Sequence, residues 1–273
     1  MPKSFSSALT TAGRVFFALA GRVFFALAIL GFGIQYAFYG HLRRGLPLCP
    51  IWLHPNTILA YSLAALCIVA GLALLSTWRT TTVSLILGLV FLATSVFYLL
   101  HFNYVAYDGN GRTLFLECIS LAASALILHG IASGSKYSLM PGRLFFGIAM
   151  IVFGIQHFLY VGFLATLVPH YLPAHHLWVL ATGLALIAAG LSIATTIEDT
   201  YAAYGLFVLF FGWLITLHIP RILHALHNGD EWSSGFVVLA FSGTSLLLAA
   251  SSAGTAIGKP SKPAPRKERP WRP

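Results

Sequence analysis

Two glutamines interrupt long apolar runs of this sequence, and their type and position suggest ligand chemistry. Gln35 lies in GFGIQY and Gln156 in FGIQHF, each thirteen residues after an arginine, Arg22 or Arg143. A polar side chain in hydrocarbon is costly unless it is hydrogen-bonded. A pair of amides at one depth can hold a carbonyl oxygen such as that of a quinone, or can bond neighbouring helices and serve packing alone. The sequence leaves both interpretations open.

Four further candidates stand at matching places in the two halves of the chain. His157 follows Gln156, and Tyr36 follows Gln35. His101 and His218 each end an apolar run. Neutral imidazole donates and accepts hydrogen bonds near neutral pH, so these side chains are candidates for the same ligand-binding region.

Two charged residues complete the set of candidate ligand-binding residues. Arg221 follows His218 in LHIPR, where it can contact an anion or form a salt bridge with Asp230 or Glu231. Glu117 lies one turn inside an apolar run, and we expect it to pair with Arg112 or to reach a cavity on the outer side. No residue can be named as catalytic, and the sequence does not decide whether the protein is an enzyme.

Metal and haem sites are disfavoured. The three cysteines have no C-x-x-C spacing, and no H-E-x-x-H motif occurs. His224 and His227 are three residues apart, one helical turn if that segment is helical, and interfacial histidines bonded to loop carbonyls are the simpler explanation. Haem would need two facing histidines deep in the bundle, where His157 is the one convincing case.

The composition identifies the medium in which these residues lie. Of 273 residues, 58% are hydrophobic and 8% are charged, against about 25% charged in soluble domains. This excludes a soluble globular protein, a disordered chain and a nucleic-acid-binding domain. The net charge of +9 is concentrated in the Pro-rich tail 253–273, which we predict to be disordered and to face anionic lipid headgroups. The bilayer is therefore the expected partner, and nucleic acid is not.

Eight apolar runs are long enough to cross a bilayer as helices, since about 20 residues are needed. They cover 22–39, 57–77, 82–100, 113–131, 143–161, 177–197, 201–218 and 233–251. With the N-terminus inside, the inner loops and the tail hold twelve of the sixteen lysines and arginines. Both termini are therefore predicted to be cytoplasmic. The predicted fold class is an all-α integral membrane protein.

The chain also contains an internal duplication. GRVFFALAILGFGIQYAFYG at 21–40 aligns without gaps on GRLFFGIAMIVFGIQHFLYV at 142–161. We predict two tandem four-helix repeats, 21–132 and 142–252, related by a pseudo-twofold axis along the membrane normal and joined by a cytoplasmic linker at 133–141. Segment 1–20 is predicted to be cytoplasmic. Within it, AGRVFFAL at 12–19 is repeated at 20–27 and is expected to lie at the membrane surface as a duplicated insert.

The second half resembles the DoxX-like family of bacterial membrane proteins. The similarity rests on an arginine opening a span, G-x-Q-H in the middle of it, a Pro-containing loop, a Trp and a helix with A-A-G, and it is weaker over 21–130. It implies a multi-pass protein of the bacterial inner membrane. It also implies an accessory subunit of a quinone-linked redox system, with a membrane or periplasmic redox partner. A transporter or lipid-binding protein with a cavity between the repeats, and a structural assembly partner, are the alternatives. The oligomeric state is left open.

Overall fold

The computed structural model describes residues 3–40 and 56–252, and all of the secondary structure in this part of the chain is helical. The helices in order are α1 (Lys3–Tyr39), α2 (Thr57–Leu75), α3 (Thr80–Leu100), α4 (Phe102–Tyr107), α5 (Gly109–Ser133), α6 (Lys136–Leu159), α7 (Val161–Leu167), α8 (His175–Thr195), α9 (Asp199–Trp213), the π-helix η1 (Leu214–His218), α10 (Ile219–His224) and α11 (Gly229–Ser252). The tail 253–273, predicted to be disordered, lies outside the described residues.

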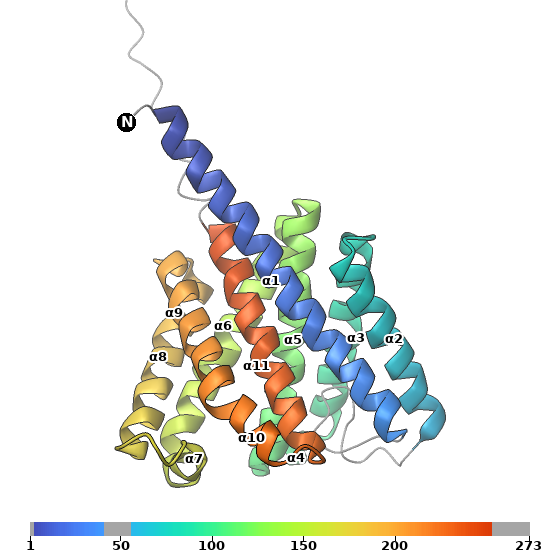
Figure 1. The fold of residues 1–273 in the computed structure, drawn as a ribbon, viewed down its shortest axis with the longest axis vertical. Helices are drawn as coiled ribbons and strands as arrows, with labels where there is room; N and C mark the ends of the chain where they lie inside the picture. Colours follow the sequence, from blue (N-terminus) through green and yellow to red (C-terminus); the bar gives the residue numbers. More distant parts are fainter. Residues whose placement is uncertain (1–2, 41–55, 253–273) are drawn as a thin grey trace, which may run out of the picture.

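Eight helical segments of the described chain are long and apolar enough to cross a membrane, which confirms the predicted fold class. They are α1, α2, α3, α5, α6, α8, the run α9–η1–α10, and α11. In α5 and α11, 72% of the most apolar window is buried, against 17–39% in the others. These two helices therefore form the centre of the bundle, and the other six cover them (Figure 1).

The two halves interlock. The first helix of each half packs on the last helix of the other, α1 on α11 and α6 on α5. Glycines allow both contacts. A Cβ on Gly21 would lie 2.6 Å from the carbonyl oxygen of Gly243, and a Cβ on Gly142 would lie 2.9 Å from that of Ala123. Helices without a Cβ at the crossing point can approach to backbone contact, which is how many membrane helices associate.

Equivalent glycines also join the first and second helix within each half. A Cβ on Gly33 of α1 would lie 2.7 Å from the backbone nitrogen of Ile68, and one on Gly154 of α6 would lie 2.6 Å from Cγ1 of Ile187. Both pairs are equivalent in the aligned halves. These contacts agree with the predicted duplication, whose pseudo-twofold axis stays a prediction.

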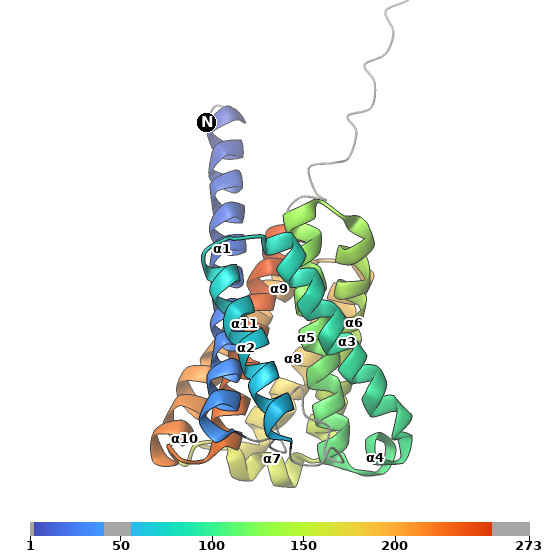
Figure 2. The same cartoon turned by 90° about the vertical axis from the view of Figure 1, so that its right-hand side faces the viewer.

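The N-terminal repeat of AGRVFFAL does not form a separate surface segment. Residues 12–19 continue α1, which begins at Lys3 and not at the predicted position 22. The N-terminal end of α1 extends beyond the other helices (Figures 1 and 2). The repeat contains no proline and has the apolar composition of a helix, so an eight-residue copy extends α1 by about 12 Å.

The connection between the halves is shorter than the predicted linker 133–141. Gly134, with φ of 70°, ends α5, and α6 begins two residues later at Lys136. Pro141 lies inside α6 and near its start, where its missing N–H leaves one carbonyl, that of Tyr137, without a helical donor. This short hairpin sets α6 directly against α5.

Candidate ligand-binding site

Gln35 is used for packing. Its side chain is buried, with 6% exposed, and its Nε2 donates to the carbonyl oxygen of Gly229 at 2.8 Å. Ser233 Oγ lies 3.4 Å from Gln35 Oε1 and donates to it. Gly229 and Ser233 belong to the first two turns of α11, so the amide of Gln35 fastens α1 to the start of α11.

Gln156, at the equivalent position in the second half, has no such partner. It is also 6% exposed, and its Nε2 is buried without a hydrogen bond among the described residues. Gln35 has two partners on α11, the carbonyl oxygen of Gly229 for its Nε2 and the hydroxyl of Ser233 for its Oε1. On α5, the aligned Gly111 accepts no bond from Gln156, and Phe115, aligned with Ser233, offers no hydroxyl. The two glutamines therefore do not act as an equivalent pair.

His157 and Tyr36 are both withdrawn from the surface of the bundle. His157 is half-buried on α6, and its Cβ would be 2.8 Å from a Cβ on Gly183 of α8. Its Nδ1 lies 2.8 Å from the carbonyl oxygen of Phe153 and must donate to it, which leaves Nε2 as the acceptor in the neutral ring. Tyr36 is fully buried. Since consecutive helical residues point about 100° apart, Gln156 and His157 do not converge on one point.

His101 and His218 differ although they end equivalent helices. His101 is exposed, and its Nδ1 is 3.4 Å from the carbonyl oxygen of Phe97. His218 closes the π-helix η1, and its Nδ1 is buried without a hydrogen bond among the described residues. Pro220 explains the irregular backbone, because it cannot donate to the carbonyl of Thr216; the hydroxyl of Tyr171 donates there at 2.7 Å.

Arg221 forms a salt bridge with Glu231, one of its two predicted partners. Its Nε and Nη2 donate to the two carboxylate oxygens at 2.8 and 2.6 Å. The Arg221 side chain is 36% exposed and that of Glu231 is 15% exposed. The pair joins α10 to the first turn of α11, and it commits the guanidinium to a carboxylate instead of to a ligand.

Glu117 does not pair with Arg112 as we predicted. Arg112 donates instead to the carbonyl oxygens of Val105 at 3.3 Å and Ala106 at 2.9 Å, and to the hydroxyl of Tyr160 at 3.4 Å. These carbonyls lie at the C-terminal end of α4, where a cation is favoured. In the described part of the chain, Glu117 makes no hydrogen bond or ion pair, and it lies half-buried on α5.

Three of the eleven histidines lie at one surface pocket. His170, His175 and His176 line a pocket of about 480 Å³ between α7 and the start of α8. Within the described ranges, no three His, Cys, Asp or Glu side chains are placed to hold a metal ion. His224 and His227 do not lie one turn apart on a helix, because α10 ends at His224.

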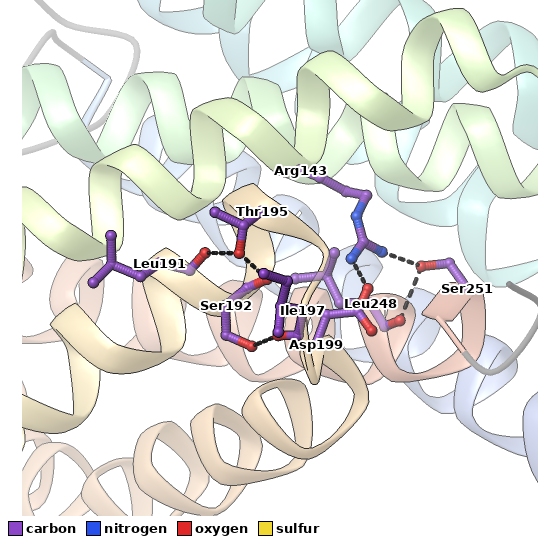
Figure 3. Close-up of polar contacts among 8 residues, drawn as sticks. All are labelled: Arg143, Leu191, Ser192, Thr195, Ile197, Asp199, Leu248 and Ser251. Atoms are coloured by element: carbon purple, nitrogen blue, oxygen red, sulfur yellow. Dashed lines mark hydrogen bonds and ion pairs between the residues drawn. The ribbon is translucent and has the colours of Figure 1, made fainter. Parts of the chain in front are cut away.

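The sequence reasoning missed a buried ion pair at the opposite end of the bundle. Arg143, which opens the predicted span 143–161, is 4% exposed and pairs with Asp199, which is 7% exposed (Figure 3). Its Nη1 donates to Ser251 Oγ at 3.2 Å. The contact joins α6, α9 and α11. The signal in the sequence was an aspartate at the start of an apolar run, on the side where basic residues predominate.

The comparisons with known proteins add one match. A family model described as "Domain of unknown function (DUF8561)" matches residues 146–240. This range runs from α6 into α11 and lies wholly within the second half. No curated protein and no solved structure matches the chain.

Proposed function

We propose that this multi-pass membrane protein binds a lipophilic carbonyl compound of the quinone class at Gln156, as an accessory membrane subunit of a quinone-linked redox system. The observation that carries the proposal is the unpaired amide of Gln156. A buried N–H donor without an acceptor costs about 1–3 kcal/mol, and a ligand carbonyl would supply the missing acceptor.

The chemistry suits a ligand that arrives through the bilayer. A quinone carbonyl accepts a hydrogen bond, and that bond is stronger in an apolar medium than in water. Nε2 of Gln156 donates, and the helices around it exclude water. Nothing in this chain is proposed to supply electrons, so a separate redox partner is part of the proposal. The DoxX-like pattern of the second half and its expected place in a bacterial inner membrane support the same assignment.

A cavity between the halves has less support. At the level where α5 meets α11, the Thr244 hydroxyl donates to Ser124 Oγ at 2.7 Å, and both side chains are fully buried. The two central helices are therefore closed against each other at this level.

The test compares two matched variants, Gln156→Leu and Gln35→Leu. Both remove an amide at equivalent positions, and leucine has nearly the same volume. The full-length protein is purified in mild detergent, and thermal unfolding is followed by circular dichroism with and without a benzoquinone that carries a decyl tail. Decylbenzene, which has the tail but no carbonyl, is the matched control ligand.

We expect the quinone to raise the Tm of the wild type and of Gln35→Leu, and to leave that of Gln156→Leu unchanged, because stabilisation follows ligand occupancy. Without ligand, Gln35→Leu should lose about 1–3 kcal/mol, whereas Gln156→Leu should be as stable as the wild type or more so. An equal shift in Gln156→Leu, or an equal shift with decylbenzene, would refute the proposed site.

A further inference from the structure

A second candidate site lies at the end of the bundle opposite to Gln156. A groove of about 440 Å³ runs between α2 and α3, within the range of about 300–1,000 Å³ typical of small-molecule sites. Its walls are almost wholly aliphatic, including Ala65, Val69, Val83 and Ile86. The two helices diverge from their connecting turn (Figure 2). An apolar slot of this kind in a membrane suits a hydrocarbon chain.

The mouth of the groove carries an aromatic residue and a cation. Trp78 is 60% exposed, and the guanidinium carbon of Arg79 lies 5.7 Å from the centre of its ring. Arg79 is exposed and makes no ion pair within the described chain. Tryptophan and arginine at the end of a span are typical of the depth at which lipid headgroups lie.

The turn places more positive potential at the same point. Arg79 is the N-cap residue of α3, and its side chain makes no capping hydrogen bond. The first amides of the 21-residue α3 are therefore not capped from this position, and a helix N-terminus favours an anion. The cation, the helix end and the apolar groove all meet at one turn.

The second half shows that the geometry of the turn does not require an arginine. The equivalent turn joins α8 to α9, with Thr196 at φ of 60° and Glu198 at φ of 50°. In the first half, Thr77 has φ of 64° and Arg79 has φ of 46°. The backbone is the same, but a carboxylate replaces the guanidinium. The charge at this position is thus independent of the fold, and it distinguishes the two turns chemically.

We infer that the α2–α3 groove binds an anionic phospholipid of the predicted cytoplasmic leaflet. One acyl chain lies in the groove, and the phosphate contacts Arg79 at its mouth. The equivalent turn of the second half, with Glu198, repels the same headgroup. The inference is independent of the quinone site.

The test uses tryptophan quenching in the full-length protein in lipid nanodiscs. Two disc preparations have the same overall mixture of phosphatidylglycerol and phosphatidylcholine and the same brominated fraction. The bromine is carried by phosphatidylglycerol in one and by phosphatidylcholine in the other. The Trp78 signal is the difference between the wild type and Trp78→Phe. We expect brominated phosphatidylglycerol to associate about fivefold more strongly at Trp78, since one basic residue near the surface favours anionic lipid by about that factor.

Two variants test the contributions of the Arg79 charge and of the groove to lipid binding separately. A third variant controls for the change in net charge. Arg79→Glu should abolish the preference for phosphatidylglycerol. Ala65→Phe, which fills the exposed side of the groove, should lower quenching while leaving Arg79 in place. Lys136→Glu makes the same charge reversal on an exposed residue outside the groove and should retain the preference. Equal quenching by both lipids in the wild type, or an unchanged preference in Arg79→Glu, overturns the inference.

Discussion

The buried pair of Arg143 and Asp199 makes the sharpest prediction about stability. We consider the single variants Arg143→Met and Asp199→Leu and the double variant. Each single variant leaves one charge without its partner among α6, α9 and α11. The two side chains are 5% and 10% exposed, so water screens the orphaned charge only slightly.

The expected magnitudes follow from that burial. Loss of one partner of a buried ion pair costs about 3–5 kcal/mol, whereas replacing both by apolar side chains is often neutral. Asp199→Leu should fall at the lower end of the range, because Arg143 keeps its hydrogen bond to Ser251. The double variant should therefore be more stable than either single variant, which means a coupling energy of several kcal/mol.

The assay is reversible unfolding in mixed micelles of increasing SDS content, followed by circular dichroism. Two matched controls are available. Arg22→Met changes the equivalent arginine of the first half, where Thr80 stands at the position of Asp199, and should cost less. Glu231→Gln weakens the more exposed Arg221 pair, and a loss of about 1 kcal/mol or less is expected. Additive losses in the double variant would refute the reasoning and would mean that Arg143 reaches water in the membrane.

Two further predictions concern packing and backbone. Gly154→Val should destabilise the α6–α8 contact by about 1–3 kcal/mol, because a Cβ there would lie 2.6 Å from a backbone oxygen. Gly205→Ala, with nothing within 4 Å, should stay within about 0.5 kcal/mol of the wild type in the same SDS titration. Tyr171→Phe should cost about 0.5–1.5 kcal/mol through the lost bond to Thr216. The same substitution in a Pro220→Ala background should cost less, since the helix then supplies its own donor; an equal cost in both backgrounds would contradict this account of η1.

Hydropathy was sufficient to predict the eight spans. The predicted end of the first span, Tyr39, is the end of α1, and the predicted start of the second, Thr57, is the start of α2. Segment 12–19 was misplaced, because the alignment of the repeats indicated where the second copy begins but not whether the helix continues through the first. The linker was predicted too long, because the Gly, Ser and Pro residues of 133–141 were interpreted as a loop although only Gly134 ends a helix.

The site residues were predictable as polar groups within the membrane, but their partners were not. Gln35 and Gln156 are equivalent in the alignment, but the acceptor of Gln35 is the carbonyl of Gly229, which is distant in sequence, and Gln156 Nε2 has no counterpart to it among the described residues. Glu117 and Arg112 are five residues apart, yet the side chain of Arg112 turns to the end of α4. The spacing of residues along one helix could not predict these hydrogen-bond partners.

The number of spans and the class of the fold follow from the sequence, because the cost of burying polar backbone and charge in a bilayer acts on each segment separately. Which of the polar groups find a hydrogen-bond partner depends on which helices pack against each other. Arg143 meets Asp199 and Ser251 because α6, α9 and α11 of the second half come together at one end of the bundle. Gln35 finds its acceptor on α11 because the first helix of one half packs on the last helix of the other. Only the tertiary structure decides these contacts, since a hydrogen bond within a membrane depends on which two helices meet and at what height.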